Sequence, residues 1–229
     1  SATKDIEIKT LPCRVEKLKL VAPDVMVIYL RLPANQRLQF LAGQYIDILL
    51  KDGKRRSFSI ANAPHDDEFL QLHARNYPGG VFTEHVFTTM KVKDMLRFRG
   101  PLGSFFLRDT PEGVPIIFLA SGTGFAPIKS ILEHVFFQEK KRGSKQKIIL
   151  YWGARTKADL YLTDLPEQWQ REHENFTYIP VLSEPLVSDH WEGRTGLVHQ
   201  AVLQDFNDLN AYQVYACGTP LMVKAAYQD

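Results

Sequence analysis

The side chains best suited to chemistry lie in one short segment, residues 55–62. Arg56 carries a planar guanidinium that can hold phosphate oxygens with two hydrogen bonds. Phe58 offers an aromatic face, and the hydroxyl groups of Ser57 and Ser59 can bond to ring heteroatoms. The segment therefore suits a flat ligand that ends in phosphate, although a basic hairpin with an ordinary core phenylalanine is an open alternative.

The sequence before this segment predicts how its side chains are presented. An apolar run at 45–50 is separated from 55–62 by a turn that contains Asp-Gly, the signature of a tight β-hairpin. Because side chains alternate along a strand, Arg56, Phe58 and Ile60 should share one face.

A glycine-rich turn in the second half is the other strong signal. Gly122, Thr123 and Gly124 stand between the apolar run 114–120 and a helical pattern, which is the context of a nucleotide-binding turn. The sequence departs from the usual G-x-G-x-x-G because Pro127 takes the last position, and no acidic residue follows the next strand. A turn that only packs is the alternative.

Two weaker stretches also attract attention. Gly80 precedes an expected helix at 81–90, whose N-terminal amides can bind an anion or simply be capped. Cys217 and Gly218 end the last expected strand, where ligands of parallel sheets collect. A buried structural cysteine is the alternative there. The histidines show no metal-binding spacing.

The elements around these residues differ between the two halves. Residues 1–109 predict five or six short strands and one helix, which argues for a sandwich or closed barrel. The expected strands are 11–21, 25–32, 44–50, 55–62, 69–76 and 94–100.

After residue 110, expected strands alternate with helices, which predicts a doubly wound parallel sheet over 110–229. The strands are 114–120, 148–152, 178–182 and 213–217, and the helices lie around 128–136, 164–173, 197–204 and 220–228. The fold is thus expected to be an antiparallel β-barrel domain followed by an α/β domain.

Charge differs between these halves as well. Residues 1–109 hold 17 Lys+Arg against 12 Asp+Glu, net +5, and residues 110–229 hold 11 against 14, net −3. A basic first half fits a polyphosphate ligand or an acidic partner rather than nucleic acid, because no basic run exceeds three residues. No apolar run is long enough to span a membrane. Two distant cysteines fit a reducing compartment, so we expect a cytoplasmic protein.

Together these motifs resemble the ferredoxin–NADP reductase superfamily over nearly the whole chain. The resemblance is strongest to the NADH-dependent reductase components of bacterial oxygenases and to the CDP-6-deoxy-glucoseen reductases, and the stretches 41–45 and 151–155 share it. It implies an FAD-binding barrel and an NAD-binding α/β domain, with NADH as the hydride donor.

The resemblance also implies roles on the flavin side. Arg56 would bind the flavin phosphate, Phe58 would stack on the ring where the family usually has tyrosine, and Ser59 would lie near flavin N5. The other candidate ligands on this side are Ser57, His73, Arg75, Gly80, Val81 and Thr83.

On the nicotinamide side, the resemblance places Cys217 near the site of hydride transfer, and Cys217 and Ser59 are the candidate catalytic residues. Glu184 stands where NADPH-using members commonly carry arginine, so NADH is expected, and Arg155 is the cation that could oppose this choice. The candidate nucleotide ligands are Gly122, Thr123, Gly124, Arg155, Ser183, Glu184, Cys217 and Gly218.

The electron acceptor implied by the resemblance is a [2Fe–2S] centre on a further domain or partner protein. The plant-type Cys-x4-Cys-x2-Cys pattern does not occur in the 229 residues, so we expect a fragment whose iron–sulfur domain lies before Ser1. A free-flavin reductase, or a nucleotide-binding electron-transfer or sensory subunit without turnover, are the alternatives.

Overall fold

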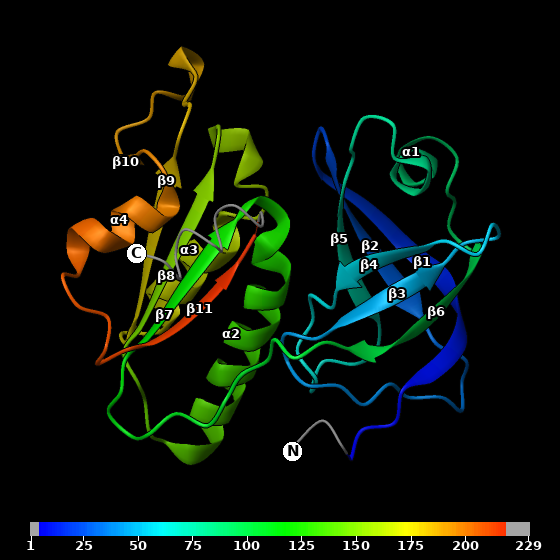
Figure 1. Ribbon diagram of the computed structural model, residues 1–229, viewed down its shortest axis with the longest axis horizontal. Helices are drawn as coiled ribbons and strands as arrows, with labels where there is room; N and C mark the ends of the chain where they lie inside the picture. The colour runs from blue at the N-terminus through cyan, green and yellow to red at the C-terminus, as the bar shows by residue number, and fades with distance from the viewer. Residues whose placement is uncertain (1–4, 219–229) are drawn as a thin grey trace. The chain divides into compact units, whose positions relative to one another are not determined.

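A computed structural model describes residues 5–218, which belong to two compact units (Figure 1). The first unit is Ser1–Arg108 with Lys129–Gln138, and the second is Asp109–Ile128 with Glu139–Asp229. The assignment of residues 1–109 and 110–229 as the two domains stays a proposal.

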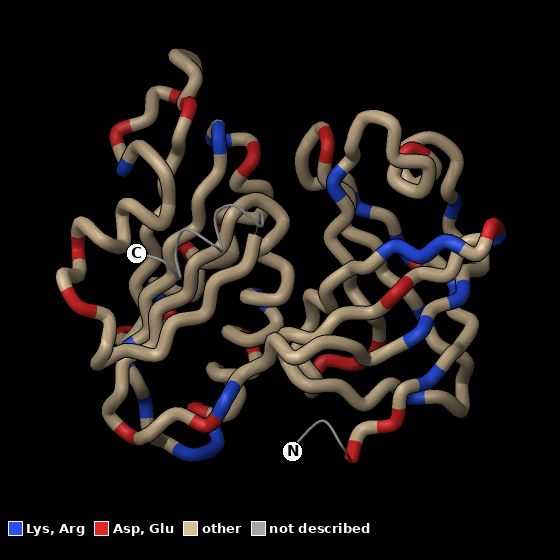
Figure 2. The backbone as a smooth tube through the Cα atoms, in the orientation of Figure 1, with Lys and Arg blue, Asp and Glu red and all other residues tan. Residues whose placement is uncertain are grey.

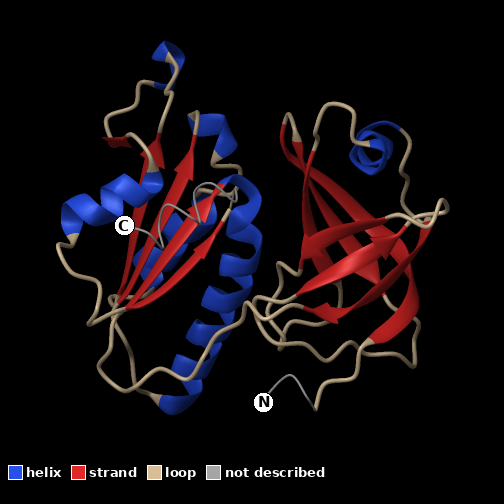
Figure 3. Ribbon diagram, viewed as in Figure 1, coloured by secondary structure: helices blue, strands red, loops and turns tan. Residues whose placement is uncertain are grey.

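Six antiparallel strands build the first unit (Figure 3). All six expected strands are present: β1 (Lys9–Ala22), β2 (Val25–Arg31), β3 (Tyr45–Leu49), β4 (Arg55–Ser59), β5 (Leu70–Arg75) and β6 (Met95–Leu102). The predicted helix is also found, as α1 (Val81–Thr88) between β5 and β6.

The order of these strands is β4-β3-β6-β1-β2-β5, so β4 and β5 are its two edges. A bridge between Ile60 and Leu72 links the chain just after β4 to β5, and the amide of Ala61 donates to the carbonyl of Gln71 at 2.8 Å. The edges are thereby joined and the sheet closes on itself, which favours the barrel over the sandwich.

The barrel core follows from the alternation of apolar residues along its strands. Ile46 and Ile48 of β3, Phe98 of β6 and Leu72 of β5 are fully buried in one cluster. Phe82 of α1 belongs to the same cluster, so the helix is held by its apolar side.

Five parallel strands build the second unit, in the order β10-β9-β8-β7-β11. Four of them confirm the predicted strands and one, β10, is new: β7 (Ile116–Ser121), β8 (Ile148–Ala154), β9 (Phe176–Leu182), β10 (Arg194–Thr195) and β11 (Gln213–Cys217). At two residues, β10 is too short to leave a periodic signal in the sequence.

Helices cover both faces of this sheet, as the doubly wound prediction requires. The helices are α2 (Phe125–Arg142), α3 (Asp164–Glu172) and α4 (Val198–Asp205). Tyr151 of β8 packs in a cluster with Val198 of α4. The next residue, Trp152, points to the opposite face and stacks on Phe125 of α2 with ring centroids 4.0 Å apart.

The helix expected at 220–228 lies outside the described residues. Within residues 5–218, no helix is long and apolar enough to cross a membrane.

Candidate functional site

Strands β3 and β4 form the predicted hairpin. The amide of Leu50 donates to the carbonyl of Lys54 at 2.9 Å across the turn. Arg56 lies opposite Ile48 and Phe58 lies opposite Ile46. Directly paired residues of neighbouring strands point to the same face, so the shared face of Arg56 and Phe58 is confirmed and is the face of the barrel core.

The two adjacent arginines of β4 differ in their surroundings. Arg55 is exposed, whereas Arg56 is half-buried and its Nη1 donates to the carbonyl oxygen of Arg55 at 2.8 Å. That bond uses one of five guanidinium N–H groups. Basic residues mark the course of β4 and recur along β6 (Figure 2). Arg56 is thus an ordered cation on the inner face of a basic hairpin.

Phe58 contacts the start of α1, so the glycine-rich turn before this helix lies near strand β4. Its ring lies 5.6 Å from that of Phe82 in the first turn of α1. No side chain caps this helix, whose N-cap residue is Gly80. The first amides of a helix have no partner within it. A Cβ on Gly80 would stand 2.5 Å from Thr83 Oγ1, so a larger residue at this position would crowd the space beside these amides.

The two serines of β4 differ in their bonding. The hydroxyl of Ser57 donates to Asp47 Oδ1 at 2.6 Å and is committed to the hairpin. Ser59 is half-buried opposite Tyr45, and within residues 5–218 its hydroxyl has no hydrogen-bond partner. Ser59 therefore keeps its full capacity to donate to a ligand.

His73 and Arg75 lie on β5, on the face opposite that of the core residue Leu72. Burial, reinforced by the positive charge of Lys129, lowers the pKa of His73 to about 3, so its imidazole is neutral at physiological pH. Arg75 pairs with Asp24 at 3.4 Å.

In the second unit, the predicted nucleotide turn forms a short 3₁₀ segment, η1 (Gly122–Gly124), between β7 and α2. Trp152 fixes it from the next strand, because its indole Nε1 donates to the carbonyl of Gly122 at 3.0 Å. Sequence reasoning did not assign Trp152 this role. A tryptophan at the end of an apolar strand is a signal that its N–H needs a polar partner.

The turn packs closely against the end of β11. A Cβ on Gly124 would stand 2.2 Å from the carbonyl oxygen of Cys217. Thr123 and Cys217 are both half-buried, so the structure brings together the residues predicted to face the nicotinamide within this unit. Burial raises the pKa of the Cys217 thiol to about 11, and the thiol is therefore protonated at neutral pH.

The residues predicted to choose the cofactor lie at the ends of β8 and β9. The amide of Ser183 donates to the carbonyl of Ala154, and the amide of Glu184 donates to the carbonyl of Arg155, each at 2.9 Å. The side chains of Glu184 and Arg155 are both exposed and form no ion pair with each other. The residues that carry this carboxylate and this guanidinium are thus joined through their backbones at this edge.

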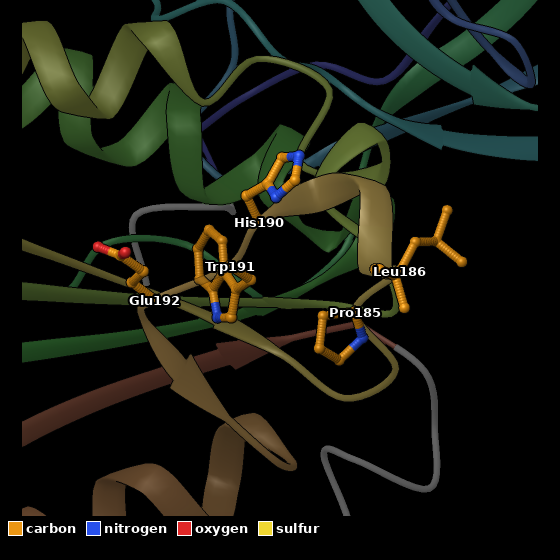
Figure 4. A pocket seen from close by; sticks show the side chains of 6 residues that line it. Pro185, Leu186, His190, Trp191 and Glu192 are labelled. Atoms are coloured by element: carbon orange, nitrogen blue, oxygen red, sulfur yellow. The ribbon is translucent and has the colours of Figure 1, made fainter.

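The residues that follow Glu184 in the chain line a shallow hollow of about 400 Å³ (Figure 4). Asp189 shapes its loop by accepting from the amides of Leu186 at 2.9 Å and Lys157 at 3.1 Å. Sequence reasoning missed this loop, in which a tryptophan two residues after Asp189 was the available signal. The lining residues are Pro185, Leu186, Val187, His190, Trp191 and Glu192.

No cluster of His, Cys, Asp or Glu able to hold a metal ion occurs within residues 5–218. The residues described above for the barrel suit a planar ligand that bears phosphate, and those at the ends of the parallel strands suit a nucleotide.

Comparison with known proteins assigns each unit to a class. Residues 12–107 match the oxidoreductase FAD-binding domain, and residues 118–228 match the oxidoreductase NAD-binding domain. The chain belongs to the ferredoxin–NADP reductase-like family of flavoprotein oxidoreductases, and the predicted resemblance is confirmed.

Among individual relatives, the chain is 42% identical over 224 residues to CDP-6-deoxy-L-threo-D-glycero-4-hexulose-3-dehydrase reductase of Yersinia pseudotuberculosis, covering 98% of this chain and 65% of that protein. It is 38% identical to reductase component 1 of terephthalate 1,2-dioxygenase from Comamonas, over 95% of this chain and 62% of that protein. The chain thus spans about 65% or less of these relatives.

Among solved structures, a cytochrome P450 reductase of Amycolatopsis superposes with a TM-score of 0.87 at 31% identity, covering 97% of this chain and 66% of that one. The predicted fold class is confirmed by this likeness and by the two sheets.

Proposed function

We propose that this chain is the flavin and nicotinamide portion of an NADH-dependent reductase that passes electrons to an iron–sulfur centre on a further domain or a partner protein. The single observation that carries the proposal is the pairing of Arg56 and Phe58 on the inner face of β4 beside the uncapped N-terminus of α1. The chemistry that FAD would supply when bound is the conversion of a hydride transfer into single-electron transfers.

The residues of the barrel fit that cofactor. The remaining guanidinium N–H groups of Arg56 and the open amides of residues 81–83 form a donor set suited to a pyrophosphate. Phe58 supplies an aromatic surface, and the Ser59 hydroxyl is available as a donor. In this proposal Arg56 and α1 bind the phosphates and Ser59 orients the flavin ring.

The residues of the second unit would hold the nicotinamide nucleotide. The protonated thiol of Cys217 is small and uncharged, so it would line a planar ring without competing as a nucleophile. Thr123 and the turn around it would bind the nucleotide backbone, while Trp152 keeps that turn in place.

Glu184 supports NADH rather than NADPH as the donor. A carboxylate accepts hydrogen bonds from ribose hydroxyl groups and repels a 2′-phosphate. Arg155 beside it opposes this preference. In the variant Glu184→Arg, kcat/KM should rise for NADPH and fall for NADH. Equal efficiencies of the original chain with both donors, unchanged in the variant, would contradict this role of Glu184.

The proposed acceptor is a one-electron iron–sulfur centre. Its support is the naming of relatives such as the terephthalate 1,2-dioxygenase component as reductase components of larger systems. A reducing, cytoplasmic compartment is part of the proposal, and the thiols of Cys13 and Cys217, which form no disulfide, are compatible with it.

The decisive experiment is the visible spectrum of the purified protein before and after anaerobic addition of NADH. We expect a flavin spectrum from one FAD per chain, and its bleaching by NADH. Absence of flavin together with failure to take up added FAD would overturn the proposal. A flavin that NADH does not bleach would favour a subunit without turnover, and release of the reduced flavin would favour a free-flavin reductase.

A further inference from the structure

A buried lysine lies against the segment that follows the proposed flavin strand. Lys129 belongs to the part of α2 that groups with the first unit and is only 8% exposed. Its Nζ donates to the carbonyl of Ala61 at 3.1 Å and to Gln71 Oε1 at 3.4 Å, and lies 2.7 Å from Glu133 Oε1. All three ammonium hydrogens thus have an acceptor, which offsets the cost of burying the charge.

Ser130, the next residue of α2, makes the matching contact one carbonyl further along. It is fully buried, and its hydroxyl donates to the carbonyl of Asn62 at 2.8 Å. The side chain of Asn62 is itself bonded, donating to the carbonyl of Asp66 at 2.8 Å and accepting from the amide of Gln71 at 2.9 Å. Two consecutive side chains of α2 therefore hold two consecutive carbonyls.

The same segment is fixed through its amides. Ile60 donates to the carbonyl of Gln44 at 3.0 Å, and Ala61 donates to the carbonyl of Gln71 at 2.8 Å. Strand β4 ends at Ser59, so the carbonyls of the residues after it lose the regular ladder of the sheet. Lys129 and Ser130 replace that ladder with side-chain donors.

We propose that Lys129 and Ser130 are positioning residues, which hold the backbone of Ala61 and Asn62 and thereby orient Ser59 at the end of the flavin strand. The proposal rests on the proposed function, because it names the residues that prepare the flavin site of the barrel. An apolar side chain at position 129 would fill the space but leave the Ala61 carbonyl buried without a donor.

A substitution at Glu133 can distinguish the effect of its negative charge from the effect of its hydrogen bond to Lys129. Glu133 lies one helical turn after Lys129, and its carboxylate is partly exposed. Glutamine at this position keeps an oxygen acceptor while removing the negative charge. If the ammonium acts through the Ala61 carbonyl, Glu133→Gln should leave the flavin site unchanged.

The test compares Lys129→Met, Ser130→Ala and Glu133→Gln with a control, Lys140→Met, whose lysine is exposed on the same helix. FAD dissociation is measured by dilution of each purified holoprotein, together with the visible spectrum of the bound flavin and hydrogen exchange of the amides at 60–62. We expect Lys129→Met to raise the dissociation constant about tenfold, to shift the spectrum and to speed exchange. We expect a smaller effect from Ser130→Ala and none from Glu133→Gln or Lys140→Met.

A folded Lys129→Met protein with the original FAD dissociation constant, spectrum and exchange rates would overturn the proposal. If Lys129→Met does not fold, Ser130→Ala decides, because original values in that variant would equally overturn it. If the original chain binds no FAD, the proposed function fails, and exchange at 60–62 then decides alone: it must be faster in Ser130→Ala than in Lys140→Met.

Discussion

Two glycine-rich turns precede helices in this protein, and they use glycine for different physical reasons. Gly79, before α1, has φ of +80°, and a Cβ there would meet no atom within 4 Å. Gly124, before α2, has an ordinary helical φ of −58°, but a Cβ there would stand 2.2 Å from the carbonyl oxygen of Cys217. The first turn needs the backbone freedom of glycine, and the second needs its small volume.

This difference shows what each turn can offer. The turn before α1 leaves the amides of residues 81–83 without a side-chain cap, between the half-buried Gly80 and the rest of the helix. The turn before α2 is already filled on one side by the protein's own strand β11. A glycine motif therefore indicates that some other group can come close to the backbone. The sequence alone does not show whether that group is a ligand or another segment of the chain.

The strongest way to break this comparison is Gly124→Ala. The added methyl group would overlap the backbone at Cys217, which cannot rotate away as a side chain can, so the free energy of unfolding should fall by about 3 kcal/mol or more. The control is Gly113→Ala, at a positive φ with nothing within 4 Å, which should cost about 1–2 kcal/mol. Urea unfolding of both variants checks this, and equal losses would contradict it.

The next effect concerns the ligand side of the comparison. Arg56→Ala should weaken FAD binding by about 1.5–3 kcal/mol, because a charge-assisted bond to phosphate is lost. Arg55→Ala is the matched control, since Arg55 is exposed and points to the other face of β4. FAD titration with fluorescence detection measures both variants. The same affinity in both variants would refute the assignment of Arg56, and not Arg55, as the arginine that points toward the flavin phosphate.

A smaller effect is expected at the first turn itself. Gly80→Ala would bring a methyl group within 2.5 Å of Thr83 Oγ1, a short side chain that can rotate, and it would crowd the open amides. FAD affinity should fall about tenfold, equal to about 1.4 kcal/mol, with a loss of unfolding free energy of no more than about 1 kcal/mol. Isothermal titration and thermal unfolding separate the two quantities. A loss of stability without a loss of affinity would make this turn as structural as the second.

The mildest test uses the pH dependence of Cys217. Because burial raises the pKa of its thiol from 9.0 to about 11, only about 1% is thiolate at pH 9, and iodoacetamide should react slowly. The folded state favours the protonated thiol, so the contribution of this group to stability is complete below pH 9 and is lost as the pH rises to 11.

Alkylation by iodoacetamide followed by mass spectrometry measures the rate at which the Cys217 thiol reacts. A thiol as reactive as that of a free peptide would show that β11 does not shield it.

Much of the fold was predictable from local patterns. Short apolar runs separated by turn residues located the six barrel strands, and the Asp-Gly turn predicted the hairpin in which Arg56 pairs with Ile48. Apolar runs followed by helical patterns located β7, β8 and α2. These signals suffice because they depend on residues that are neighbours in sequence, where strand and helix periods act directly.

The partners of the motifs were not predictable in the same way. Nothing local links Gly124 to Cys217, Trp152 to Gly122, or Lys129 to Ala61, although each pair is in contact in the structure. The two-residue strand β10 and the loop around Trp191 also lack a period of their own.

The sequence by itself determined which residues alternate, where chains turn and which side chains carry chemistry, since these follow from residue type and spacing. Only the tertiary structure decided which glycine has open space around it and which lies against β11, and which buried carbonyls accept from Lys129 and Ser130. The physical reason is that such contacts join residues up to 93 positions apart, as for Gly124 and Cys217, and are selected by the packing of the whole unit.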